Sequence, residues 1–182
     1  MINWEQFKTE EEALAYIMAE KGINATDARK YLQRNLPKES YYQDKIIKHI
    51  RKLFPLSVVW KEAAGAYSRQ GIPDVTAVIN GRYYGFEVKR PFVGVLSKIQ
   101  EQTIKRIRAA GGRAYVVTYP AEVTELLKEE MEADIDKKVE FWHNNETGQT
   151  LQEFFNLSDK EYEEWLKNGN SVLLEKAGGG QH

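Results

Sequence analysis

Residues 71–89 read GIPDVTAVINGRYYGFEVK, and this stretch decides the fold of the chain. The dipeptide Asn80-Gly81 stands between two runs rich in β-branched and aromatic residues, 75–79 and 82–86. This dipeptide suits a two-residue turn, because both central positions of such a turn require positive φ. Flanked by strand-forming runs, it is the strongest short-range signal for a β-hairpin. The sequence therefore predicts two antiparallel strands joined by a tight turn.

A two-residue turn also determines which side chains face each other across the hairpin. Ile79 then pairs with Arg82, and counting back along both strands pairs Asp74 with Glu87. Because side chains alternate along a strand, Glu87 and Lys89 share one face, while the apolar residues between them point to the other. The sequence thus predicts two carboxylates and a lysine on the polar face of the sheet.

Two opposed carboxylates need a partner that offsets their repulsion. With Cβ atoms about 5 Å apart, the repulsion is roughly 3 kcal/mol at an effective dielectric constant of about 20. Lys89 offsets part of it, and an oxygen-rich site of this kind also suits Mg²⁺ or Mn²⁺. Such a metal can orient a phosphate and activate water, with an ammonium group beside the water. The alternative is an ordinary exposed salt-bridge set on a sheet face.

Helices and strands alternate around this hairpin. Apolar residues recur at helical spacing on both sides of it, and Pro55, Gly111 and Pro120 mark element ends. We expect Ile99, Ile104 and Ile107 to face inward. The pattern predicts an α/β fold with a mixed central sheet flanked by helices. The expected helices open at Thr9 and cover about 26–35, 39–54, 97–110 and much of the chain beyond 120, with further strands at 57–60 and 114–118.

The composition favours a globular cytoplasmic protein. The chain is 42% hydrophobic and 29% charged, has no cysteine and has an acidic beginning that is unlike a secretory signal. It also lacks a membrane-spanning apolar run. We therefore expect a cytoplasmic location and no membrane partner.

Charge is distributed unevenly along the chain. Residues 38–118 hold 15 Lys/Arg and 6 Asp/Glu, whereas residues 119–182 hold 6 and 15. The basic middle segment can attract a polyanion such as DNA. The acidic segment either shields this basic segment or is a solvated helical surface.

The hairpin and its flanks resemble a known family. Residues 71–74 followed by Glu87-Val88-Lys89 resemble the PD-(D/E)XK nuclease signature. The flanking matches are closer still to its VRR-NUC branch, and the resemblance covers roughly residues 38–120. These flanking matches are Glu39 and Gln43, the segment 96–100 and the strand 111–117.

The resemblance implies a PD-(D/E)XK (restriction-endonuclease-like) core with two extensions. Residues 1–37 would form a helical N-terminal extension, 38–120 the VRR-NUC-like nuclease core, and 121–182 an acidic, mainly helical C-terminal extension. Because stand-alone members of this branch are associated with branched DNA, including Holliday junctions, and tend to be dimers, we expect DNA as partner and a possible homodimer. The C-terminal extension is a possible surface for a protein partner, and phage origin would mean the host cytoplasm.

The implied activity is that of an Mg²⁺- or Mn²⁺-dependent DNA endonuclease. Asp74, Glu87 and the Val88 carbonyl would bind the metal, and Lys89 would lie beside the water. Glu39 would complete the acidic cluster directly or through water. Gln100 would belong to the active site, although Ser97 and Gln100 also form a capping box that needs no catalysis. The residues expected to contact DNA phosphates are Arg69, Arg90, Lys98 and Lys105.

Other active-site classes fit poorly. The histidines His49, His143 and His182 have no metal-ligand spacing, and neither a phosphate-binding glycine loop nor a nucleophile elbow is present. The remaining alternative is a catalytically silent DNA- or protein-binding module that retains a nuclease fold. This alternative does not explain why two carboxylates that repel each other, Asp74 and Glu87, are both present.

Overall fold

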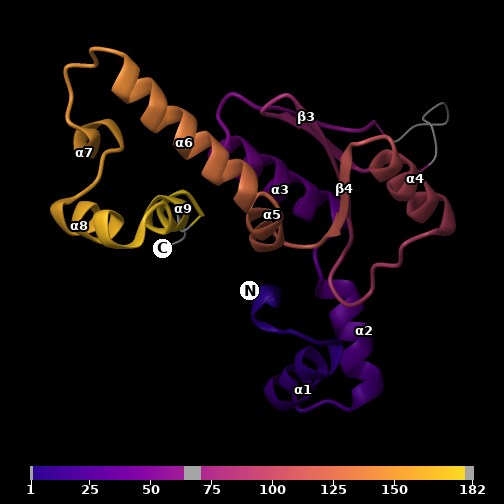
Figure 1. Ribbon diagram of the computed structural model, residues 1–182. Helices are drawn as coiled ribbons and strands as arrows, with labels where there is room; N and C mark the ends of the chain where they lie inside the picture. Colours follow the sequence, from indigo (N-terminus) through magenta and orange to yellow (C-terminus); the bar gives the residue numbers. More distant parts are fainter. Residues whose placement is uncertain (1, 64–70, 179–182) are drawn as a thin grey trace.

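The computed structural model describes residues 2–63 and 71–178, which form a central α/β body and two helical lobes (Figure 1). The sheet of the central body has the order β1-β2-β3-β4. β1 and β2 are antiparallel, as are β2 and β3, whereas β3 and β4 are parallel. The predicted mixed sheet is thus confirmed. Its strands are β1 (Val58–Lys61), β2 (Val75–Ile79), β3 (Arg82–Val88) and β4 (Arg113–Val117).

The hairpin has the predicted register. Ile79 pairs with Arg82 and Val75 with Phe86. Asn80 and Gly81 have φ values of 51° and 79°, the left-handed conformation that a two-residue turn requires. The turn chemistry therefore specified the pairing of the strands that carry the predicted site.

Helices cover both faces of the sheet (Figure 1). α3 (Glu39–Leu53) packs on one face, and α4 (Lys98–Ala109) connects β3 to the parallel strand β4 on the other. Ile104 of α4 is buried, but Ile99 is 49% exposed, so the prediction that Ile99 faces inward is wrong. Five residues of helix rotate a side chain by about 140° from its starting direction, which separates these two isoleucines.

The main core extends beyond the residues of the sheet and α3. α5 (Pro120–Leu126) and α6 (Lys128–Asn144) follow β4. Val123, Leu127 and Met131 belong to the same buried cluster as the apolar residues of the sheet and α3. The main core therefore continues past residue 120, while the division of the chain into three domains stays a prediction.

The N-terminal lobe has a small core of its own. It comprises η1 (Trp4–Gln6), α1 (Glu10–Lys21) and α2 (Ala25–Asn35). Phe92 and Val93, which follow the predicted catalytic motif, pack against this second core. The N-terminal lobe thus contacts the loop that leaves β3. Its buried residues are Trp4, Ala13, Leu14, Ile17, Ala28, Leu32 and Leu36.

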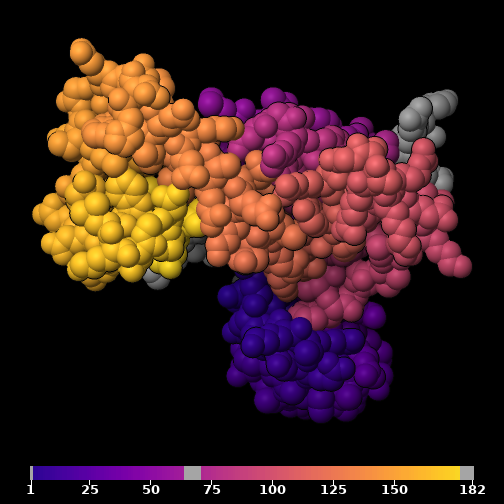
Figure 2. All heavy atoms as spheres, viewed as in Figure 1, coloured from indigo at the N-terminus to yellow at the C-terminus, as the bar shows by residue number. Residues whose placement is uncertain are grey.

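The C-terminal lobe lies at the opposite end of the molecule from α4 (Figure 1), and in the space-filling view its surface continues into that of the central body (Figure 2). It is built from the distal part of α6 with α7 (Leu151–Phe154), α8 (Asp159–Asn168) and α9 (Ser171–Gly178). Ile135, Leu157 and Leu173 form its buried core.

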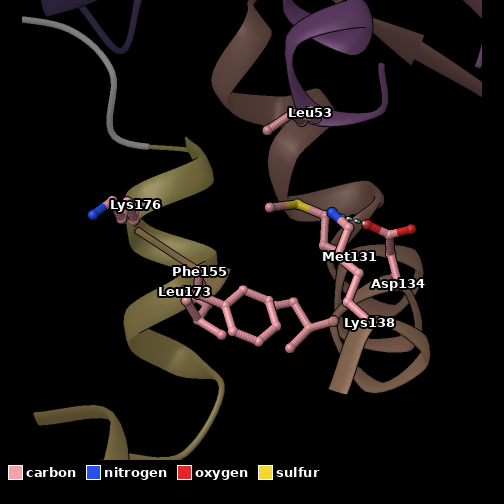
Figure 3. Close-up of a pocket in the computed structure, with 8 residues that line it drawn as sticks. Leu53, Met131, Asp134, Lys138, Phe155, Leu173 and Lys176 are labelled. Atoms are coloured by element: carbon pink, nitrogen blue, oxygen red, sulfur yellow. Dashed lines mark ion pairs between the residues drawn. The ribbon is translucent and has the colours of Figure 1, made fainter. Parts of the chain in front are cut away.

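A cavity of about 220 Å³ lies where this lobe meets α6 (Figure 3). Its lining is largely apolar, with two lysines at the edge. Lys138 is paired with Asp134 at 2.8 Å, and Lys176 with Glu161 at 3.0 Å. Both lysines that line the cavity thus have carboxylate partners. Within the described ranges, no helix combines the length and the apolarity that crossing a bilayer requires.

Candidate active site

The predicted polar face of the hairpin is buried. Glu87 of β3 has no exposed surface, and Lys89, directly after β3, is 9% exposed. Lys89 Nζ donates to Oε1 of Glu87 at 2.5 Å. The alternative of an exposed salt-bridge set is therefore wrong, because helices cover the face that it required to be open.

Asp74 is held next to Glu87 by the backbone. Its Oδ2 accepts a hydrogen bond of 2.8 Å from the N–H of Val88, and its carbonyl accepts one from Glu62. The preceding Pro73 packs against Gly85, where a Cβ would lie 2.8 Å from the Pro73 Cγ. The close approach of Pro73 to β3 therefore requires glycine at position 85.

Gln100 makes the expected helix cap and also contacts Glu87, while its role in catalysis stays a prediction. Its Oε1 accepts a hydrogen bond from the Ser97 N–H at 2.9 Å, which forms half of the capping box of α4. Its Nε2 donates to Oε1 of Glu87. One amide thus caps the helix and orients the carboxylate, so the two interpretations are compatible.

The environment of Glu87 favours a protonated carboxyl group. The pKa of Glu87 is raised to about 7, because burial and the charge of Asp74 raise it by more than Lys89 lowers it. Glu87 Oε2 is buried and has no hydrogen-bond partner in the described part of the chain. A buried carboxylate oxygen without a partner is costly unless a cation or a proton accompanies it.

Glu39 lies near this pair, at the first residue of α3. Burial raises the pKa of Glu39, and the charges of Lys89 and Asp74 also act on it. Among residues 2–63 and 71–178, however, no three His, Cys, Asp or Glu side chains are grouped closely enough to hold one ion. Direct metal binding by Glu39 has no support in this geometry, and its role through water stays a prediction.

The residues expected to contact DNA lie in different surroundings. Arg69 is outside the described residues. Lys98 and Lys105 are exposed on α4, and Lys105 is paired with Glu101 at 2.6 Å. Lys98 lies about 160° around the helix from Gln100. The two lysines therefore face away from Glu87, and their contact with phosphate stays a prediction.

Arg90 contacts the protein's own backbone. Its guanidinium donates to the carbonyl oxygens of Pro37 and Leu36 at 2.9 Å each, and to that of Gln33 at 3.3 Å. The Arg90 side chain thus links the end of α2 to the segment that directly follows Lys89. Contact of Arg90 with a DNA phosphate stays a prediction.

One acidic residue next to Asp74 in the sheet was not identified from the sequence. Lys61 pairs with Val75, and the Glu62 N–H donates to the Asp74 carbonyl at 2.8 Å, so Glu62 lies opposite Asp74. Its Oε1 accepts hydrogen bonds from Trp60 and Thr76. Extending the strand register from β2 to β1 would have placed Glu62 opposite Asp74. The sequence between β1 and β2 has no tight-turn signal, however, so their register could not be predicted.

No protein-family model matches the chain, and no curated protein matches it. A solved structure described as a VRR_NUC domain is similar to it at 23% identity and a TM-score of 0.42, covering 50% of this chain and 94% of its own. Hjc, a Holliday junction resolvase from Archaeoglobus fulgidus, is similar at 24% identity and a TM-score of 0.36, covering 44% and 67%. The first of these carries the name of the family that the sequence motifs resemble.

Proposed function

We propose that this chain is a divalent-metal-dependent DNA endonuclease of the VRR-NUC type. One observation supports this above all others, namely the fully buried Glu87 beside Asp74, with Oε2 lacking a hydrogen-bond partner in the described residues. A structural salt bridge has no need for a second carboxylate or for an unpaired oxygen. A metal-binding site needs both.

The donor set fits Mg²⁺ or Mn²⁺. Asp74 and Glu87 supply carboxylate oxygens, and the Val88 carbonyl is the third donor that the motif implies. Hard cations of this kind prefer oxygen ligands and keep several water molecules. When bound, such an ion supplies positive charge that stabilises the attacked phosphate and lowers the pKa of a bound water.

The chain's own residues prepare the site for phosphodiester hydrolysis. Lys89 uses one of its three N–H donors on Glu87, which leaves others for a water molecule or a phosphate oxygen. Gln100 holds the Glu87 carboxylate in one orientation and is itself held by Ser97. We assign Lys89 to orienting the attacking water and to compensating negative charge in the transition state.

DNA is the proposed substrate because residues 38–118 carry an excess of nine basic groups, 15 against 6. A preference for branched or junction DNA, a homodimer and a protein partner for the C-terminal lobe rest on the family resemblance and the chain's added segments. The preference for branched DNA is tested by the cleavage assay below.

The test is a cleavage assay with single-stranded, duplex, flap and four-way junction DNA in Mg²⁺, Mn²⁺ or EDTA. We expect cleavage that requires metal and that Asp74→Asn abolishes. Glu101→Gln is the matched control, since Glu101 is an exposed carboxylate of α4 paired only with Lys105 among the described residues. Binding of DNA without cleavage in either metal would contradict the proposal and favour the catalytically silent binding module.

A further inference from the structure

Arg90 joins the N-terminal lobe to the predicted catalytic motif. It follows Lys89 directly, and its guanidinium donates three hydrogen bonds to the carbonyls of Gln33, Leu36 and Pro37. The last carbonyls of a helix have no partner within the helix. Arg90 supplies donors at this end of α2, and at the link between α2 and α3.

This brace lies directly before Glu39. Only Lys38 separates Pro37 from Glu39, the first residue of α3, and the Lys38 side chain makes no capping hydrogen bond. α3 packs against β3, and the charges of Lys89 and Asp74 both act on the Glu39 carboxyl group. The contact between Arg90 and Pro37 thus ties the start of α3 to the residue after Lys89.

The loop after Arg90 strengthens the same connection. Phe92 has a φ of 63°, which is unusual for a residue with a side chain, and it packs against the core of the N-terminal lobe. Gly94 rests on the catalytic motif, since a Cβ there would lie 2.7 Å from the Cβ of Lys89. Successive residues of one loop thus contact the lobe and Lys89 in turn.

We propose that Arg90 is a positioning residue that acts through Glu39, and that the N-terminal lobe (residues 2–36) is a working part of the active site. This inference rests on the proposed function, because Glu39 affects a rate only if the site cleaves DNA. It replaces a phosphate contact as the main role of Arg90. A guanidinium is required because a lysine ammonium cannot present donors in the planar fork that reaches several carbonyls.

The first experiment is a double-mutant cycle on single-turnover cleavage. Arg90→Lys, Arg90→Gln and Glu39→Gln are measured alone and in combination. A misplacement of about 1 Å can cost about 100-fold in rate, so we expect losses of about 10- to 100-fold for both Arg90 variants, at unchanged DNA affinity. In the Glu39→Gln background the Arg90 substitutions should cost little more, because the group that they misplace is already lost.

Arg34→Lys and Arg34→Gln are matched controls. Arg34 is an exposed arginine of α2 with no ion pair in the described part of the chain. Both variants should cleave at nearly the parent rate. Full activity of Arg90→Lys, with weaker DNA binding by Arg90→Gln and a salt dependence reduced by about one phosphate contact, would overturn the proposal in favour of a phosphate contact. Additive losses with Glu39→Gln would overturn it as well.

The second experiment does not depend on cleavage. Hydrogen exchange is measured on the whole chain, with the Arg90 variants compared with the parent and the Arg34 controls. The amides of Leu36 and Tyr41 donate to Leu32 and Lys38, and they should exchange faster when Arg90 is replaced, while the amides of the sheet stay protected. Unchanged exchange at these amides, or global unfolding of Arg90→Lys, would overturn the proposal. If the parent cleaves no DNA, the proposed function fails, and exchange alone decides whether the brace exists.

Discussion

Lys89 Nζ and Glu87 Oε1 form a contact of 2.5 Å in the interior of the protein. Removing one member of a buried pair leaves the other charge uncompensated, which typically costs about 3–5 kcal/mol. Glu87 has a second partner in Gln100, whereas Oε2 has none among the described residues. Substitutions at this site must therefore keep shape and polarity if effects on cleavage are to be separated from effects on folding.

Asp74→Asn and Glu87→Gln should each abolish metal-dependent cleavage while the fold is kept. Each removes one charge of an opposed pair, so thermal stability of Asp74→Asn in EDTA should be equal to or above that of the parent. Glu87→Gln also takes the charged partner from the buried Lys89, so its thermal stability should be lower. Cleavage and thermal unfolding are measured on the same preparations. Full activity in either variant would show that the metal site lies elsewhere.

Lys89→Met should lower the cleavage rate by about 10²- to 10⁴-fold, the usual contribution of a group that assists proton transfer. Lys89 also opposes the rise in the pKa of Glu87, so its loss raises that pKa further. Metal affinity should therefore weaken at neutral pH but recover at higher pH, where Glu87 is ionised. Titration calorimetry at several pH values tests this, and a loss of affinity at every pH would make Lys89 a structural residue.

Metal binding should depend on pH through Glu87. Burial raises the pKa of this carboxyl group to about 7, so the folded protein holds a proton there that the unfolded chain releases at lower pH. Without metal, stability should fall as the pH rises from the ordinary carboxyl pKa of 4.5 to about 7. Mg²⁺ or Mn²⁺ affinity should rise over the same interval and then level off. Glu87→Gln should flatten the stability profile, and an equally steep profile in that variant would contradict the assignment.

The two contacts of Gln100 can be separated by three substitutions. Ser97→Ala removes only the cap and should cost about 1 kcal/mol of stability with little effect on cleavage. Gln100→Glu keeps an acceptor for the Ser97 N–H but replaces the donor to Glu87 with a second carboxylate, so both cleavage and stability should fall. Gln100→Ala should lose both, yet less activity than Asp74→Asn. If Gln100→Ala only lowers the melting temperature, the capping role is sufficient.

The stability of the hairpin turn should depend on Glu130, a residue beyond position 120. Glu130 is 2% exposed and accepts hydrogen bonds from Asn80, Arg82 and Tyr84 at the hairpin turn. Glu130→Ala should destabilise the fold by about 2–4 kcal/mol, because it leaves several donors without a partner. Cleavage per folded molecule should not change, since the turn is at the other end of β3 from Glu87.

Two truncations test the same boundary. Removal of residues 127–182 takes Leu127 and Met131 out of the main core and should prevent folding, whereas removal of residues 145–182 keeps both. Circular dichroism and thermal unfolding distinguish the two results. A folded, stable product of the longer truncation would place the boundary near residue 120, as the sequence predicts.

Local sequence signals were sufficient to predict the hairpin and its register. Asn80-Gly81 selects a two-residue turn, and the period of two along each strand then places Glu87 and Lys89 on one face. The capping box of Ser97 and Gln100 is equally local. These features depend on residues a few positions apart, so the amino-acid sequence alone specifies them.

Tertiary structure alone decided what surrounds the polar face. Ile99 is exposed although its residue type favours burial, and Glu87 lies in the interior although its residue type favours solvent. Arg90 contacts carbonyls 53 to 57 positions earlier in the chain, and Glu130 reaches the hairpin from 46 to 50 positions later. Such contacts form only when distant segments pack together, and the periodicity of one segment carries no information about the partner that will cover it.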